Sequence, residues 1–215
     1  MNDEINKSTI KYIIIGNTGV GKTNIIYRFV NGEFENSLQS TIGMEFTTKD
    51  YKIGENIFHL QLYDTGGAEH FGSLRQNYYN NADCVIIVYD ITNKESFNSI
   101  GQWIEECENS HNEDLIKILV GNKTDLSKEK RKVTEKEGKD LADRYGIDFY
   151  ETSALNGYNI EKIFFDCCKK IYKNSRDNHS DEEDNNEGEN GDIIALNNEN
   201  ENNIHVIRHK SCCFH

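Results

Sequence analysis

Short apolar runs alternate with stretches of helical periodicity along the first 174 residues. Runs such as Tyr12–Ile15 and Val85–Tyr89 have no polar face, which is typical of strands buried on both sides of a mostly parallel sheet. The pattern predicts strands at Ile10–Gly16, Phe46–Ile53, Phe58–Asp64, Cys84–Asp90, Leu115–Gly121 and Ile147–Glu151. It predicts helices at Gly21–Asn31, Ser73–Asn80, Glu95–Ser110, Thr134–Tyr145 and Tyr158–Asn174. We therefore expect an α/β domain with a mostly parallel six-stranded sheet and helices on both faces.

The periodic pattern ends after Asn174. Residues Ser180–Asn203 are mainly Asp, Glu and Asn, with Ile193–Leu196 as the one apolar island. Such a segment buries too little surface to offset the entropy lost on ordering, so we predict disorder. The sequence is thus interpreted as a flexible N-terminus (1–8), one folded domain (9–174) and a disordered acidic tail (175–215).

Charge and cysteine content exclude several classes of protein. The formal net charge is −13, whereas a nucleic-acid binder needs a basic face. No apolar run approaches the ~18 residues of a membrane-spanning helix. Six cysteines lack the short spacings of metal sites, which favours a reducing cytosolic setting with structural thiols inside the domain. They are Cys84, Cys107, Cys167, Cys168, Cys212 and Cys213.

A phosphate-binding motif follows the first predicted strand. Residues Gly16–Thr23 read G-x-x-x-x-G-K-T and lead directly into a predicted helix. The glycines let backbone N–H groups and the helix N-terminus converge on phosphate oxygens. Lys22 would lie beside the β- and γ-phosphates, and the Thr23 hydroxyl would bind Mg²⁺. The alternative, an ordinary glycine-rich turn, does not account for Lys-Thr at the helix start.

A second motif, Asn122-Lys123-Thr124-Asp125, lies at the carboxyl end of a predicted strand, where α/β sheets bind ligands. The Asp125 carboxylate can accept hydrogen bonds from guanine N1–H and its exocyclic amine, a pair of donors that adenine lacks. Asn122 would lie at the other edge of the base and the Lys123 stem along it. Taken alone this is often only a polar turn. Together with the phosphate motif it predicts guanine binding and disfavours a nucleotide-dependent kinase.

These motifs make the sequence resemble small GTPases of the Ras superfamily over residues 9–174. The resemblance implies a G domain of the P-loop NTPase class that binds GTP or GDP with Mg²⁺. It places Phe34 against the base, Glu151–Ala154 near guanine O6, and Gly67 at the γ-phosphate. The nucleotide-binding residues it implies are Thr18, Gly19, Val20, Gly21, Lys22, Thr23, Asn24, Phe34, Thr41, Gly67, Asn122, Lys123, Asp125, Ser153, Ala154 and Leu155. The implied metal site is Thr23, Thr41 and Asp64, the last usually through water, and the implied catalytic set is Lys22, Thr41 and Gly67.

The branch that the sequence most resembles is Rab, through four segments: Ile42–Phe46, Tyr78-Tyr79, Val88–Thr92 and Gln102–Ile104. This resemblance implies a switch in vesicle trafficking on the cytoplasmic face of an intracellular membrane, cycling with cytosol. The implied partners are an exchange factor, a GTPase-activating protein, a prenylation escort and a GDP-dissociation inhibitor. Effectors would bind the switch regions and the aromatic residues Phe46, Tyr63 and Tyr78, for which core packing is the alternative. We interpret Trp103 as a core residue.

One departure from the family pattern bears on catalysis. Switch II reads Asp64-Thr65-Gly66-Gly67-Ala68-Glu69, with Ala68 where the family has a water-orienting glutamine. A methyl group neither donates nor accepts a hydrogen bond. Two hypotheses follow: slow intrinsic hydrolysis that a partner partly rescues, or a constitutively GTP-loaded scaffold with essentially no turnover. A lesser departure is Leu155, where many relatives have lysine.

Two adjacent cysteines, Cys212 and Cys213, precede the last two residues of the sequence and resemble the Rab site of double geranylgeranylation. Two lipids anchor far more firmly than one. Residues 175–211 hold ten acidic and three basic side chains, so an anionic membrane surface would repel this segment. Membrane choice should therefore depend on lipids and protein partners. Cys167 and Cys168 are instead expected to pack against the sheet from within a helix.

Overall fold

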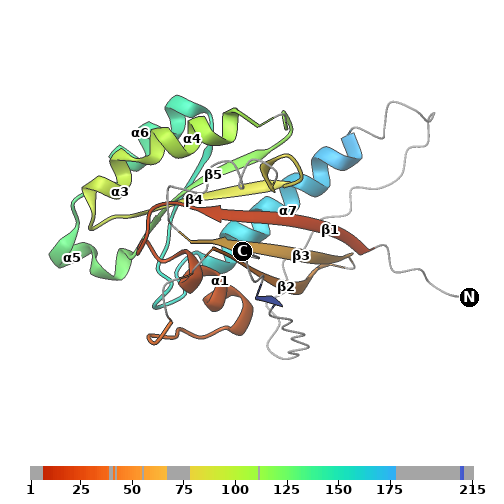
Figure 1. Cartoon of the computed structure of the whole chain (residues 1–215), viewed down its shortest axis with the longest axis horizontal. Coiled ribbons are helices and arrows are strands. Elements are labelled where there is room, and N and C mark those ends of the chain that lie inside the picture. Colours follow the sequence, from red (N-terminus) through yellow and green to blue (C-terminus); the bar gives the residue numbers. More distant parts are fainter. Residues whose placement is uncertain are drawn as a thin grey trace, which may run out of the picture.

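A sheet built around β1 (Lys7–Ile15) organises the chain (Figure 1). The structure is a computed structural model that describes residues 7–38, 41, 43–54, 56–66, 78–110, 112–177 and 209–210. The strands that follow β1 are β2 (Met44–Ile53), β3 (Asn56–Thr65), β4 (Cys84–Asp90), β5 (Ile116–Asn122) and β6 (Asp148–Glu151). Their order is β6-β5-β4-β1-β3-β2, and only the β2–β3 pair is antiparallel. The predicted mostly parallel six-stranded sheet is confirmed. A two-residue strand, β7 (His209–Lys210), adds to the β2 edge.

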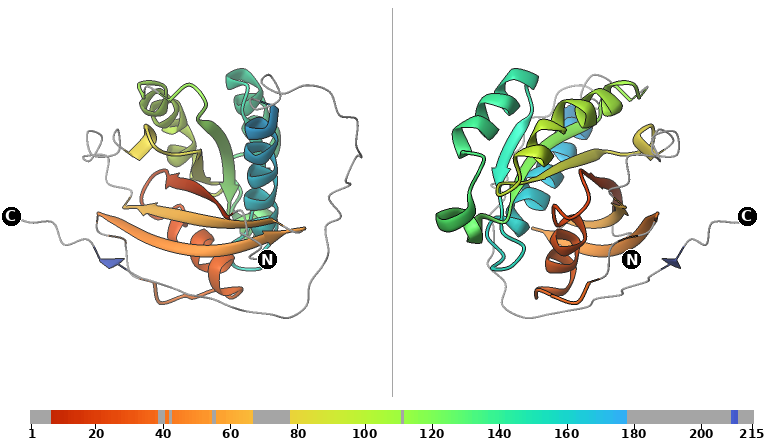
Figure 2. Two further views of the ribbon diagram at one scale, coloured as in Figure 1. Left: turned by 90° about the vertical axis from the view of Figure 1, so that its right-hand side faces the viewer. Right: turned by 60° about the vertical axis from the view of Figure 1, so that its left-hand side comes forward.

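Helices cover both faces of this sheet (Figure 2). Tyr12 and Ile14 of β1 point into a core formed with α1 (Lys22–Asn31) and α7 (Ile160–Asp177). Ile13 and Ile15 point to the opposite core, formed with α4 (Ile100–Glu108) and α6 (Glu135–Tyr145). Successive side chains of β1 point to opposite faces of the sheet, as in any strand. The side chains on each face are apolar because both faces of the sheet are buried. None of the described helices has the length and apolarity needed to cross a bilayer.

Several predicted boundaries were wrong. The single helix expected over Glu95–Ser110 is two helices, α3 (Lys94–Asn98) and α4, which meet at Ser99. The Asn93 side chain caps α3 by accepting hydrogen bonds from the N–H groups of Glu95 and Ser96. Two short helices, η2 (Thr124–Leu126) and α5 (Ser127–Lys130), were not predicted.

The observed boundaries of the folded domain also differ from the predicted ones. Residues 7 and 8, assigned to the flexible N-terminus, belong to β1, and α7 continues to Asp177 rather than ending at Asn174. The helix expected at Ser73–Asn80 lies outside the described residues up to position 77. Most of the predicted disordered tail, including the two cysteines predicted to be lipidated, also lies outside them.

The cysteines inside the described domain are buried and form no disulfide bonds. They are Cys84, Cys107, Cys167 and Cys168. As expected, Cys167 and Cys168 of α7 pack against the sheet, where the Cys168 sulfur lies 3.1 Å from the Tyr12 hydroxyl. Burial raises the pKa of Cys107 and of Cys168 to about 12. Because thiolates carry out cysteine chemistry, these residues act as packing groups.

Helix α6 passes close to the sheet at Gly138. A β-carbon there would stand 2.4 Å from the Tyr89 hydroxyl oxygen and 2.6 Å from the Phe149 ring. Tyr89 is fully buried, and among the described residues its hydroxyl has no hydrogen-bond partner. The helix can therefore approach the sheet only because position 138 carries no side chain.

Gly138→Ala should lower the free energy of unfolding by about 1–3 kcal/mol, because the overpacked core must shift, even though alanine favours helices. Denaturant unfolding of the purified protein measures this free energy. The matched control is Gly101→Ala in α4, where the new β-carbon would meet only the Tyr145 hydroxyl at 3.6 Å. That control should be neutral or stabilising by up to ~1 kcal/mol. Equal effects of the two changes would contradict the packing argument.

Candidate nucleotide-binding site

The predicted functional residues gather at the carboxyl edge of the sheet. The strands β1, β3, β4, β5 and β6 end there, and the register aligns Asp90 with Asn122 and Ile14 with Asp64. The strand ends and the loops that follow them carry the phosphate motif, Asp64, the Asn122–Asp125 motif and Ser153–Leu155. Parallel sheets bind ligands at this edge, because the loops and helix N-termini that follow the strands converge on it.

The phosphate loop turns from β1 into α1 through Gly21, the residue that precedes the helix, with φ 98°. A β-carbon at Gly21 would lie 2.5 Å from the Asn122 carboxamide nitrogen, so the loop requires glycine there. Lys22 is 5% exposed, and its ammonium donates to the main-chain oxygens of Gly16 at 2.8 Å and Asn17 at 3.0 Å. The loop thus holds a cation beside the N-terminus of a helix, an arrangement that suits an anion.

The second motif is fastened to the phosphate loop by direct hydrogen bonds. The Asn122 carboxamide nitrogen donates to the Val20 oxygen at 2.9 Å. Lys123, in a left-handed conformation with φ 72°, donates through its ammonium to the Gly19 oxygen at 2.7 Å. The same ammonium forms an ion pair with Asp90 at 2.7 Å. The two motifs, about 100 residues apart in sequence, therefore form one site.

Asp125 lies at the exposed rim of this site. Its carboxylate accepts a hydrogen bond from the buried Ser153 hydroxyl at 2.6 Å. The neighbouring Ala154 N–H donates to the Asn122 carboxamide oxygen at 3.3 Å. Leu155 is 49% exposed, and its main-chain oxygen accepts from the Arg28 guanidinium at 3.0 Å. A carboxylate held by Ser153 and open to solvent is suited to accept paired N–H donors from a base.

Three oxygen-bearing side chains meet beside Lys22. The Thr23 and Thr41 hydroxyls donate to one Asp64 oxygen at 2.6 and 3.0 Å, and they lie 2.8 Å from each other. Burial raises the pKa of Asp64, while hydrogen bonds from both threonines and the Lys22 charge act in the opposite direction. The second carboxylate oxygen of Asp64 is buried and, among the described residues, has no hydrogen-bond partner.

This cluster fits a magnesium ion. Mg²⁺ prefers oxygen ligands in an octahedron with bonds near ~2.1 Å, which places neighbouring ligands roughly 3 Å apart. The three side-chain oxygens have this spacing. A divalent cation would also compensate the buried carboxylate, whose charge is otherwise unfavourable in this environment.

The remaining predicted residues surround the site or fall outside the described residues. Thr18 is exposed at the tip of the phosphate loop, and the Asn24 carboxamide donates to the Glu35 oxygen at 3.1 Å. Phe34 is half-buried and packs against the core formed with α1 and α7. Gly67 and Ala68 lie outside the described residues, so the structure does not place them.

Three residues of the site were missed from the sequence: Asn17, Arg28 and Asp90. Asp90 pairs with Lys123, Arg28 holds the loop around Leu155, and the Asn17 carboxamide oxygen accepts from the indole N–H of Trp103 at 2.8 Å. Trp103 was interpreted only as core, and it is indeed 4% exposed. A buried tryptophan N–H needs an acceptor, and this signal could have pointed to a polar partner.

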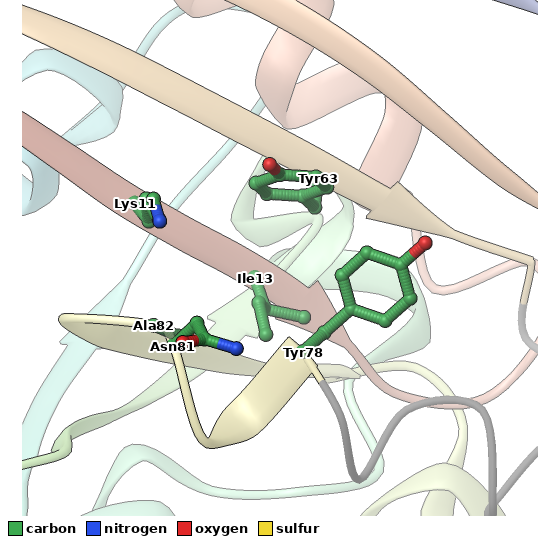
Figure 3. Close-up of a pocket in the computed structure, with 6 residues that line it drawn as sticks. All are labelled: Lys11, Ile13, Tyr63, Tyr78, Asn81 and Ala82. Carbon is green, nitrogen blue, oxygen red and sulfur yellow. The ribbon is translucent and has the colours of Figure 1, made fainter.

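The aromatic residues predicted to face partners form a continuous cluster. Ring centroids of Phe46 and Tyr63 lie 5.0 Å apart, and those of Tyr63 and Tyr78 lie 5.5 Å apart. Figure 3 shows Tyr63 and Tyr78 facing one pocket beside β1. The volume of this pocket is about 220 Å³. Its described lining residues are Lys11, Ile13, Tyr63, Tyr78, Asn81 and Ala82. Tyr78 is 40% exposed, so the cluster is reachable from solvent.

Comparison with known proteins agrees with this arrangement. Residues 11–173 match the model of the Ras family. The chain is 39% identical over 174 residues to Ras-related protein RAB1BV of Beta vulgaris, covering 81% of each chain. It is 40% identical over 172 residues to Ras-related protein Rab-8B of Dictyostelium discoideum, covering 80% of this chain and 84% of that one. It is 41% identical over 162 residues to Rab-11B of the same organism, with coverage of 75% and 73%.

Proposed function

The chain belongs to the Ras family as a Rab-type small GTPase that binds GTP and GDP with Mg²⁺, and from this premise we propose that it is a molecular switch regulating intracellular vesicle trafficking. The observation that carries the proposal is the joining of two motifs into one site by the hydrogen bonds of Asn122 and Lys123. Calorimetric titration with GDP and GTP in the presence of Mg²⁺ tests it. Strong heats with guanine nucleotides and none with ATP are expected, and no heat with any nucleotide would refute it.

Each side of the site has a distinct task in this proposal. Lys22 holds charge beside the β- and γ-phosphates, and N–H groups of the loop from Thr18 to Thr23 bind phosphate oxygens. Thr23, Thr41 and Asp64 hold Mg²⁺, which neutralises charge on the phosphates when bound. Asp125 selects guanine, with Asn122 and the Ser153–Leu155 loop supporting it. Phe34 covers the base, and Asn24 holds the chain after Phe34 through the Glu35 oxygen.

Switching is proposed to involve residues 34–46 and 64–79. Among the described residues of the first segment, Thr41 is the one that belongs to the metal cluster, and its hydroxyl donates directly to Asp64 at the end of β3. Contacts of Thr41 and Gly67 with the γ-phosphate would order both segments, and loss of that phosphate would release them. Lys22, Thr41 and Gly67 are the proposed catalytic groups.

We expect slow intrinsic hydrolysis because Ala68 replaces the water-orienting glutamine. Ala68→Gln should raise the single-turnover rate at least tenfold from a value below the order of 10⁻⁴ s⁻¹, since a positioned polar group contributes roughly 10²–10⁴-fold. Phosphate release from GTP-loaded protein measures the rate. Ala68→Met, which is similar in length but lacks the amide, is the matched control and should stay slow. Equal rates for the parent and the glutamine variant would contradict this expectation.

The alternative function is a constitutively GTP-loaded scaffold, and Ala68 is the observation that favours it. In this case a GTPase-activating protein would not rescue turnover. The test is the lifetime of bound GTP with such a protein present. Persistence of GTP for hours supports the scaffold, whereas conversion to GDP within minutes supports the switch with a catalytic group supplied by the partner.

The proposed exchange factor, GTPase-activating protein and effectors act on two surfaces. An exchange factor and a GTPase-activating protein would bind the switch segments, and effectors would dock on Phe46, Tyr63 and Tyr78. The cluster supports the effector proposal because its rings touch and Tyr78 is exposed. GTP-dependent effector binding that survives Tyr78→Ala would contradict it.

Cys212 and Cys213 are the proposed lipidation site, holding the protein on the cytoplasmic face of an intracellular membrane. A prenylation escort and a GDP-dissociation inhibitor would then allow cycling with cytosol. The intact mass of protein recovered from a eukaryotic membrane fraction tests this proposal. Two prenyl groups lost in the Cys212→Ser, Cys213→Ser variant are expected, and an unmodified mass would refute it.

A further inference from the structure

The single tryptophan of the sequence, Trp103, joins helix α4 to the phosphate loop. The indole is buried in the core between the sheet and α4, and its N–H donates to the Asn17 carboxamide oxygen at 2.8 Å. An indole N–H can only donate, so the atom that faces it must be an acceptor. The orientation of the Asn17 carboxamide is therefore determined by Trp103.

The other end of the Asn17 carboxamide is held by the same part of the chain. Its nitrogen donates to the Ser99 hydroxyl at 3.2 Å, and that hydroxyl donates to the Glu95 main-chain oxygen at 3.1 Å. Ser99 and Trp103 are four residues apart at the start of α4, so they lie one above the other on one side of the helix. Two residues of this helix start thus hold one side chain of the phosphate loop.

Asn17 in turn contacts the cation of the site. Its main-chain oxygen accepts from the Lys22 ammonium at 3.0 Å, next to the Gly16 oxygen at 2.8 Å. We propose that Trp103 is a positioning residue for the phosphate loop: by holding the Asn17 carboxamide, it keeps the Asn17 main-chain oxygen in place and so orients Lys22. This inference rests on the proposed function. It assigns control over the shape of the nucleotide site to Trp103, a residue that lies outside that site.

Packing alone does not explain an indole at this position. The other buried residues of α4 are Ile100, Ile104 and Cys107, which fill the same core without a strong polar group. An indole N–H in such a core costs free energy unless an acceptor faces it. Here the acceptor belongs to the second residue of the phosphate loop, 86 positions earlier in the sequence.

The test is the rate at which a fluorescent GDP analogue leaves the full-length protein, chased by excess GDP with Mg²⁺. Trp103→Phe keeps an aromatic ring but removes the N–H, and should accelerate release about 3- to 10-fold, the size expected for one lost hydrogen bond. The matched control is Ile104→Val, the next residue of α4, which is 1% exposed and has no side-chain group that could hydrogen-bond to Asn17. It should destabilise the fold yet leave release unchanged. Release from Trp103→Phe at the parent rate, or equal acceleration by both variants, would overturn the proposal.

A double-mutant cycle separates this role from a general loss of packing. If Trp103 acts through Asn17, Trp103→Phe and Asn17→Ala combined should accelerate release no more than the stronger single change. Additive effects would overturn the proposal. Because the sequence has one tryptophan, Asn17→Ala should also shift the emission of Trp103, whereas Ile104→Val should not. A parent protein that binds no GDP would refute the proposed function itself, which is a different result from normal binding with unchanged release.

Discussion

Asp125→Asn should reverse the base preference of the protein from guanine to xanthine. A carboxylate presents two acceptors to the N1–H and amino group of guanine, whereas an asparagine presents one acceptor and one donor. The amide donor would face the guanine amino group, which is also a donor, but would match the oxygen that xanthine carries there. Sites built on paired hydrogen bonds reject a mismatched ligand by large factors, so affinity for GDP should fall at least 100-fold. Affinity for xanthosine diphosphate should rise by a comparable factor.

Competition of each diphosphate against labelled GDP or labelled xanthosine diphosphate measures both affinities. The reversal requires the rest of the site to stay intact, and the structure supports this because Ser153 can donate to an asparagine oxygen as it does to Asp125. The matched control is Asp140→Asn on α6, the same chemical change at an exposed acid that pairs with Lys136. It should leave both affinities unchanged. Loss of GDP binding without any gain for xanthosine diphosphate would mean that Asp125 supports the loop rather than selecting the base.

The parts of this molecule that sequence reasoning predicted well are those with a strong local or periodic signal. The strands β1, β4 and β5 are buried on both faces over most of their length, so their apolar runs stand out, and the phosphate motif imposes its own strand–turn–helix context. The break between α3 and α4 was missed because the apolar positions Phe97, Ile100 and Ile104 keep a helical spacing across Ser99. The short helices after Asn122 have no periodicity that could reveal them.

Sequence patterns did not predict several contacts between segments that lie far apart in the sequence. Lys123 was expected to lie along the base, and the structure adds that its ammonium joins Gly19 and Asp90, which no motif spacing predicts. Trp103 was correctly assigned to the core, but its hydrogen bond to Asn17 depends on how α4 lies over the phosphate loop. The direction of a polar atom inside a core is a property of the packed structure, so residues that act through such atoms emerge only from coordinates.

Asp64→Asn should have opposite effects on stability with and without magnesium. With GDP and Mg²⁺ the variant should lose most of the metal's contribution, because a ligating carboxylate becomes a neutral amide. Mutation of a residue that only hydrogen-bonds to a metal ligand typically lowers metal affinity roughly 10–100-fold. The change at Asp64 itself should therefore lower Mg²⁺ affinity at least ~100-fold. Chelation by EDTA, which should speed GDP release from the parent, should then have little further effect on the variant.

Without metal the sign should reverse. Burial raises the pKa of Asp64, which means that the folded protein disfavours the ionised form at neutral pH. This penalty is present above the folded pKa and is relieved as pH falls through it, and the neutral asparagine avoids it. In excess EDTA at pH 7 the variant should therefore unfold at a higher temperature than the parent, while in Mg²⁺ it should unfold at a lower one. The matched control is Asp90→Asn, a buried carboxylate outside the metal cluster that pairs with Lys123 and accepts from the Thr92 hydroxyl. It should lower the unfolding temperature by a similar amount in both buffers, and the same pattern for Asp64→Asn would exclude Asp64 from the metal site.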